Sequence, residues 1–183
     1  MDILSENISK IVKNKKRLEN SLNVKIAINK DKISIQGLPE NEYIAEKVIE
    51  AIDFGFPVSA AVLIKEEDFL FEILDIKKYT HRKDFERIRA RLIGRRGKTL
   101  KTLTHLTECN FELKDNNVGI IGPPERIKNA QDAVILLIQG SKQANVYSFL
   151  EKHRVQPILD LGLKERKKKA KKEIKSQGIR LDI

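Results

Sequence analysis

The sequence is short of the residues that mark a disulfide scaffold or a metal centre. It has one cysteine, Cys109, and no tryptophan, and aromatic residues make up 5% of its 183 positions. A single cysteine excludes an internal disulfide. His105 and Cys109 stand four apart, but two ligands do not make a zinc site. We therefore expect no metal and no cofactor, and interpret the pair as a surface histidine and a buried thiol.

Long apolar runs are also missing, whereas positive charge is in excess. The N-terminal MDILSENISK has no signal-peptide pattern, and no apolar stretch reaches bilayer length. We therefore expect a soluble, cytoplasmic protein. The net charge is +10, which points to a polyanionic partner, either nucleic acid or an acidic membrane surface.

The positive charge is concentrated near the C-terminal end. Residues 163–175, LKERKKKAKKEIK, contain eight Lys or Arg and two Glu, so this stretch holds more than half of the net charge. Such a run either binds phosphate loosely or is a solvated helix or disordered end. The run by itself does not decide between these alternatives.

Two stretches of the chain repeat each other. Residues 23–52 and 108–137 align without a gap at an offset of 85. The aligned stretches have apolar residues, glycines and prolines at the same positions. The matched pairs are Ile26 and Phe111, Ile28 and Leu113, Ile33 and Val118, Ile35 and Ile120, Gly37 and Gly122, Pro39 and Pro124, and Gly55 and Gly140. This agreement indicates two copies of one structural unit.

Each copy is predicted to contain a hairpin followed by a helix. Apolar alternation at residues 24–28 and 33–35 predicts two strands with one buried face, joined by the polar turn NKDK. A proline after each hairpin fits the first turn of a helix, and Gly55 and Gly140 predict the helix ends.

The second copy has further elements in front of its hairpin. Residues 69–76 predict a strand, and KDFERIRARLI and KTLKTLTHLTE predict two helices around a turn. The predicted order is strand, helix, turn, helix, strand, strand, helix. In the first copy KNKKRLENSLN is helical, but a matching opening strand would fall before residue 1.

The turn between the two helices, within LIGRRGKTLKTL at 92–103, combines glycine with positive charge. Gly94 and Gly97 permit backbone angles that a side chain forbids, and they let a ligand backbone approach closely. The N–H groups that begin the next helix favour an anion at the same place. The basic residues around it are Arg95, Arg96, Lys98 and Lys101. This arrangement suits a phosphate backbone, although a tight turn alone would also need the glycines.

An enzymatic function is not expected. GRRGKT ends like a nucleotide-binding P-loop, but that motif needs glycine where Leu92 stands and a strand before the loop, whereas FERIRARLI is helical. No Ser-His or Cys-His pairing stands out in the chain.

These features resemble the KH domain, an RNA-binding module whose G-x-x-G loop clamps the backbone of about four nucleotides. RARLIGRRGKTLKTLTHLTECNFELKDNNVGIIGPPERIKNAQDAVILLIQG and ANVYSFLEKHR resemble the Partner-of-Nob family of tandem-KH ribosome-assembly proteins. AIDFGFPVSAAVLI and FEILDIKKYT agree with it as well. The resemblance covers about residues 8–154 and leaves out the basic tail.

The resemblance implies an α+β fold of two tandem type I KH domains, each βααββα, packed together. Residues 1–64 are expected to form a degenerate KH domain that lacks a full first strand. Residues 65–155 are expected to form a KH domain with an intact loop, and residues 156–183 a basic tail. It also implies binding of single-stranded RNA, namely small-subunit rRNA near its 3′ end, during ribosome assembly. The implied partners are the rRNA-maturation nuclease and the alpha subunit of translation initiation factor two.

In this interpretation the second copy binds the RNA. Ile93, Leu103, Phe111 and Leu113 line the base-binding surface or the core beneath it, with the core favoured for Leu103 and Phe111. The predicted RNA-binding residues are Ile93, Gly94, Arg95, Arg96, Gly97, Lys98, Lys101, Arg89 and Arg91. For Arg89 and Arg91, in the preceding helix, simple solvation is the alternative.

The first copy departs from this pattern. Shifting the glycine loop back by 85 lands on Ser9-Lys10-Ile11-Val12, where both glycines are gone. We expect the first copy to pack against the second or to hold a protein partner. The alternative is weak, unspecific RNA binding through its lysines at 10, 13, 15 and 16. For the whole chain the alternative function is a protein-interaction scaffold that binds RNA nonspecifically through its tail.

Overall fold

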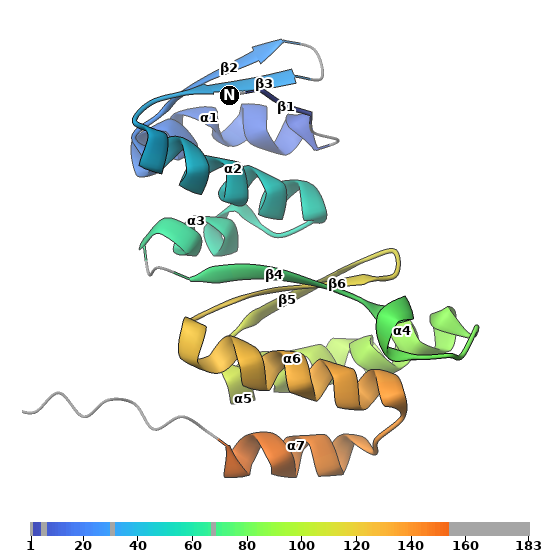
Figure 1. The fold of residues 1–183 in the computed structure, drawn as a ribbon. Helices are drawn as coiled ribbons and strands as arrows, with labels where there is room; N and C mark the ends of the chain where they lie inside the picture. The colour runs from blue at the N-terminus through green and yellow to red at the C-terminus, as the bar shows by residue number, and fades with distance from the viewer. Residues whose placement is uncertain (1, 5–6, 30–31, 67–68, 154–183) are drawn as a thin grey trace, which may run out of the picture.

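The computed structural model describes residues 2–4, 7–29, 32–66 and 69–153, which form two units stacked on each other (Figure 1). Each unit contains one three-stranded antiparallel sheet with helices packed against it. The predicted basic tail at 156–183 lies outside the described residues. Within the described ranges, every helix is too short or too polar to span a bilayer.

The N-terminal unit runs from β1 to α3. Its elements are β1 (Asp2–Leu4), α1 (Ile8–Leu22), β2 (Lys25–Asn29), β3 (Lys32–Gln36), α2 (Pro39–Phe54) and α3 (Val58–Glu66). The strands lie in the order β1-β3-β2. The predicted hairpin is confirmed, because Ile26, Ile33 and Ile35 are buried while their neighbours on the strands face outward.

Two expectations for this unit are wrong. An opening strand lies within the chain and not before residue 1, since β1 pairs with β3 from Asp2 opposite Ser34 to Leu4 opposite Lys32. It has three residues against six in β4, so the predicted lack of a full first strand holds. The order βααββα is not followed, because the single helix α1 stands where two helices and a loop were expected. One helix uses less chain than two, so the strand fits between residue 1 and α1.

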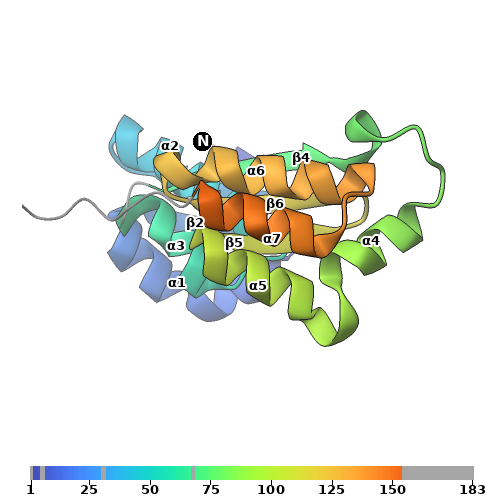
Figure 2. The ribbon, with the colours of Figure 1, turned by 90° about the horizontal axis from the view of Figure 1, so that it is seen from below.

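The second unit has the predicted order of strand, two helices, two strands and a helix. Its elements are β4 (Leu70–Asp75), α4 (Phe85–Ile93), α5 (Lys98–Thr107), β5 (Asn110–Lys114), β6 (Asn117–Gly122), α6 (Pro124–Gln139) and α7 (Gln143–Lys152), with 3₁₀ turns at Ile76–Tyr79 and Arg95–Gly97. The strand order is β4-β6-β5. The helices α3 and α7 were not predicted. Seen from below, α7 covers α5 and α6 (Figure 2).

The internal repeat is confirmed in the backbone. Ile26 pairs with Ile35 in the first hairpin, and Phe111 pairs with Ile120 in the second, so the register is identical at the offset of 85. The predicted helix ends are also confirmed. Gly55 and Gly140 end α2 and α6 with φ of 135° and 105°, which glycine adopts at little cost.

The central strand of the second unit's sheet is buried on both faces. In this strand, β6, Val118 and Ile120 belong to the core under α4, α5 and α6, whereas Ile121 belongs to the core of the N-terminal unit. Gly119 lies beneath two phenyl rings, because a Cβ there would be 2.7 Å from both Phe54 and Phe56. The two units therefore share a close-packed interface across β6.

Adding a methyl group at this interface should destabilise the protein. In Gly119→Ala the new Cβ meets buried rings, and we expect the free energy of unfolding to fall by about 1–3 kcal/mol, measured by urea denaturation. Ala27→Val, on the exposed face of β2, is the control and should change it little. An unchanged value for Gly119→Ala would contradict the close packing.

Candidate nucleic-acid interface

The glycine turn connects α4 to α5 through backbone that an ordinary side chain resists. Gly94 has φ 72° and ψ 173°, and Gly97 has φ 73° and ψ 12°. Between them Arg96 also has a left-handed backbone, with φ 56°. The N–H of Gly97 donates to the carbonyl of Gly94 at 3.1 Å. The turn is thus a tight, defined structure with both arginine side chains outside it.

The two glycines have different reasons for lacking a side chain. A Cβ at Gly94 would collide with the Thr99 hydroxyl and lie 2.7 Å from the Thr99 Cβ. No described atom lies within 4 Å of a Cβ built on Gly97. Gly94 is therefore required by packing inside the protein, whereas Gly97 faces open space that a ligand can enter.

The predicted basic residues of the turn surround this open space. The charged side chains are exposed at Arg95, Arg96, Lys98 and Lys101. Ile93, directly before the turn, is 40% exposed although it is apolar. The helix α5 begins here at Lys98, and no side chain caps its first turn. Uncapped N–H groups and nearby cations together favour a bound anion.

Arg89 connects α4 with the turn between β5 and β6. Its guanidinium donates to the carbonyl of Asp115 at 3.1 Å and to the side-chain oxygen of Asn116 at 3.4 Å. An open cleft lies at this place. Its lining residues are Lys83, Asp84, Phe85, Glu86, Arg87, Arg89 and Asn116. The helix α4 leads from this cleft to the glycine turn, so the positive surface extends along the helix.

The edge of β5 adds backbone groups to the interface. In the N-terminal unit the N–H of Ile26 points away from β3, because it donates to the Glu19 carboxylate at 2.9 Å. The second hairpin has the same register, so the N–H and carbonyl of Phe111 point to the outer edge of β5. The Phe111 and Leu113 side chains pack partly against the core, and Leu103 lies fully inside it.

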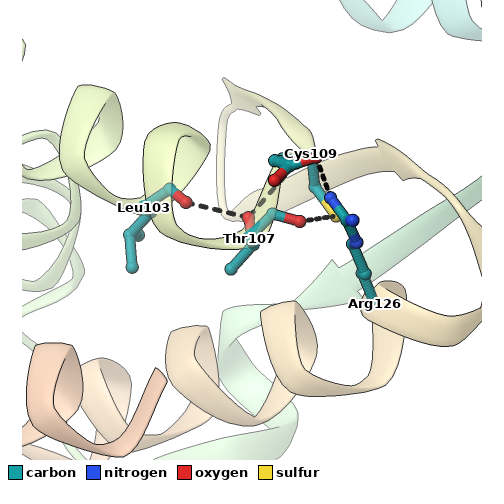
Figure 3. Close-up of polar contacts among 5 residues, drawn as sticks. Leu103, Thr107, Cys109 and Arg126 are labelled. Carbon is teal, nitrogen blue, oxygen red and sulfur yellow. Dashed lines mark hydrogen bonds and ion pairs between the residues drawn. The ribbon is translucent and has the colours of Figure 1, made fainter. Parts of the chain in front are cut away.

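A polar network holds the junction between α5 and β5 (Figure 3). The Thr107 hydroxyl donates to the Leu103 carbonyl at 2.8 Å and accepts from the Cys109 N–H at 3.2 Å. Glu108 adopts φ 55° and forms an ion pair with Arg126. These contacts reverse the chain, so that the edge of β5 runs beside α5. The expected buried thiol is confirmed, since Cys109 is fully buried.

Arg91, predicted to contact RNA or to be solvated, is half-buried. Its guanidinium donates a hydrogen bond to the Ser141 carbonyl, in the segment between α6 and α7. At least one of its donors is therefore used inside the protein. Among the described residues, no group of three or more His, Cys, Asp or Glu could hold a metal ion.

The N-terminal unit lacks the corresponding turn. Residues 9–12 lie inside α1, where Val12 is 53% exposed. A groove between α1 and β2 contains Lys15 and Glu19, which are 3.9 Å apart. The Glu19 carboxylate accepts the hydrogen bond of the Ile26 N–H. It therefore places negative charge at the edge of β2, where a ligand would otherwise bind. The second unit has Thr104 at the position equivalent to Glu19.

Comparison with known proteins agrees with this geometry. Residues 70–155 match a model of the eukaryotic type KH domain, KH-domain type I, in its Partner-of-Nob form. A KH domain-containing protein of Methanocaldococcus jannaschii is 31% identical over 76% of this chain. These matches confirm the resemblance of the chain to the Partner-of-Nob family of KH-domain proteins.

The family relatives differ in length from this chain. The chain covers 65% of the Methanocaldococcus protein. It is 32% identical to the pre-rRNA-processing protein pno1 of Aspergillus oryzae over 58% of this chain, and it covers 43% of that protein. It therefore spans about half the length of the relatives that it matches.

Solved structures with the same fold are also found. The crystal structure of Dim2p from Pyrococcus horikoshii superposes with a TM-score of 0.75 at 25% identity, covering 83% of this chain and 98% of that one. A complex of a/eIF2alpha, aDim2p and rRNA from the same organism gives a TM-score of 0.75 at 24% identity, covering 84% and 93% of the two chains, and supports the fold.

Some residues of the interface were not predicted from the sequence. Lys83 and Arg87 line the cleft beside α4. Lys83 precedes the N-cap of α4 and Arg87 lies in its first turn, so the folded chain and not helical spacing brings them to one cleft. Asn116 could not be predicted, because only the folded hairpin brings it opposite Arg89.

The buried thiol yields a test of the α5–β5 junction. Burial raises the pKa of Cys109 to about 11, with the Thr107 hydrogen bond opposing this shift. We expect a disulfide reagent to leave Cys109 unlabelled in folded protein at pH 8, because the thiol is neutral and inaccessible. The same reagent should label it fully in denaturant. Rapid labelling of folded protein would contradict the observed burial.

Proposed function

We propose that this chain binds single-stranded RNA through its second unit. The observation that carries the proposal is the turn at Gly94–Gly97, where exposed cations and an uncapped helix start surround open space at Gly97. The KH-domain match over 70–155 supports it, because the turn has the position and sequence of the G-x-x-G loop.

Each part of the interface has a separate role in this proposal. Gly97 admits the RNA backbone, and Arg95, Arg96, Lys98 and Lys101 neutralise its phosphates. The Phe111 N–H and carbonyl, at the edge of β5, meet the hydrogen-bonding edge of a base. Ile93 offers an exposed apolar surface for a base face. Arg89 fixes the β5–β6 turn against α4 at the other end of the interface by its bonds to Asp115 and Asn116.

The N-terminal unit is assigned a supporting role, in a tandem arrangement of KH-type domains. We propose a degenerate domain at residues 1–64, an RNA-binding domain at 65–155 and a basic tail at 156–183. The helix α1 in place of the loop and the Glu19 carboxylate at the edge of β2 both argue against RNA binding there. The packing of this unit on β6 supports its role as a platform for the second unit.

The RNA that we propose is small-subunit rRNA near its 3′ end, bound during ribosome assembly. Relatives named as pre-rRNA-processing proteins support this choice, and so does the Pyrococcus complex that contains rRNA. The same complex supports the alpha subunit of initiation factor two as a partner. The maturation nuclease as a second partner follows from the family resemblance. We assign the chain no catalytic step.

Replacing Gly97 tests the proposed function. Asn and Asp both tolerate left-handed backbone, and a Cβ here has no atom within 4 Å apart from its chain neighbours, so the fold should persist in either variant. In Gly97→Asp a carboxylate faces the phosphates, and we expect affinity for a short RNA from the 3′ end of small-subunit rRNA to fall at least about tenfold. Fluorescence anisotropy measures the affinity.

Gly97→Asn is the matched control, since it adds the same shape without charge. It should bind more tightly than Gly97→Asp. Replacing Gly94 would not serve, because a side chain there collides with Thr99 and disturbs the fold. If both Gly97 variants bind like the wild type, the loop is only a structural turn. The alternative function then replaces the proposed one, namely a protein-interaction scaffold that binds RNA nonspecifically through its tail.

The salt dependence of RNA affinity tests which lysine and arginine side chains contact phosphate. Each phosphate contact on a single strand contributes about −0.7 to the slope of log affinity against log salt. The double variant Arg95→Gln with Lys98→Gln should therefore flatten the slope by about 1.4. Lys13→Gln with Lys16→Gln, on exposed positions of α1, is the control and should leave the slope unchanged. An equal flattening in both would show that the N-terminal unit also contacts RNA.

A further inference from the structure

The segment between α6 and α7 contacts the helices that form the glycine turn. The Arg91 guanidinium, on α4, donates to the Ser141 carbonyl. In return, the Gln143 side-chain amide donates to the Arg91 carbonyl at 3.4 Å and to the Thr99 hydroxyl at 2.8 Å. Two hydrogen-bonding side chains therefore cross this junction in opposite directions.

Thr99 connects these contacts to the glycine turn itself. Its side chain is 3% exposed and lies directly against the Cα of Gly94, where no Cβ could fit. The Thr99 hydroxyl is therefore held between Gly94 on one side and the Gln143 amide on the other. Thr99 is the second residue of α5, so its position sets where the first turn of α5 starts.

The turn needs such support because its backbone is costly. Arg96 has left-handed φ without being glycine, and Gly94 has positive φ with an extended ψ. Residues in such conformations persist where surrounding structure determines them. The arginine guanidiniums of Arg82 and Arg91 lie near Gly140, at the C-terminal end of α6, where the helix dipole favours positive charge. The segment is thus fixed at both of its ends.

We propose that Gln143 is a positioning residue for RNA binding, which holds the glycine turn in its binding conformation through the Thr99 hydroxyl. Arg91 acts with it by fixing Ser141, which accounts for its half-buried position better than a direct RNA contact. The helix α7 therefore serves the interface without touching RNA. This inference rests on the proposed RNA-binding function of the second unit.

The experiment compares side chains of equal size with and without the hydrogen bond. Gln143→Met removes the amide but keeps the length, and Thr99→Val removes the hydroxyl but keeps the shape. Thr99→Ser keeps the hydroxyl and should bind like the wild type. Gln139→Met, at an exposed position at the end of α6, is the matched control. Three quantities are measured on the full chain: RNA affinity, Tm, and hydrogen exchange at residues 94–99 without RNA.

For Gln143→Met and Thr99→Val we expect affinity to fall about three- to tenfold, because the turn is in its binding conformation for a smaller fraction of the time. Exchange at 94–99 should become faster, while Tm and exchange in α6 stay close to the wild type. The double variant should be no weaker than the weaker single variant, since both changes remove the same hydrogen bond between Gln143 and Thr99.

Two results would overturn the inference. One is unchanged affinity and unchanged exchange in Gln143→Met. The other is faster exchange throughout the second unit with a lower Tm, which would make Gln143 a general structural residue. Failure of the RNA-binding proposal looks different, because Gly97→Asp would then bind like the wild type. Exchange at 94–99, measured without RNA, still decides the positioning role in that case.

Discussion

The arrangement of the protein depends on the burial of β6 from both sides. Val118 and Ile120 face one core, and Gly119 and Ile121 face the other, so a single strand is packed against both units. Phe54, Phe56 and Phe71 meet there with ring centroids 5.8–6.0 Å apart. Because close-packed interiors do not deform continuously, the two units are held in one relative position. The outer edge of β5 and the glycine turn between α4 and α5 lie outside this interface.

The two copies of the repeat show how one hairpin can keep its register while the surface beside it changes. Both hairpins pair in the same way, and Asn23 and Glu108 end the preceding helices with nearly the same left-handed φ of 54° and 55°. The differences lie in charge and in the loop. One copy has α1 and a carboxylate at the strand edge, whereas the other has glycines, arginines and Thr104. The first is suited to packing and the second to an anion.

Much of the second unit could be predicted because its patterns are local. Apolar alternation marks the strands, proline and glycine mark the helix ends, and GRRG with Lys98 marks the candidate anion site. The helices α3 and α7 were missed, since each is short and follows a helix stop without a distinct pattern of its own. The strand β1 was missed because the fixed offset implied two helices in the first copy, and the chain forms one.

The sequence by itself determined the local structure, the repeat and the place of the positive loop, because these follow from periodicity, turn residues and charge between near neighbours. Only the tertiary structure decided which face of the second sheet the N-terminal unit covers, and that Arg91 bonds to Ser141 rather than facing solvent. It also decided that Gly94 makes room for Thr99 while Gly97 faces open space. These outcomes depend on contacts between residues far apart in the chain. Two glycines are identical in the sequence, so the sequence does not tell which of them will pack against another residue.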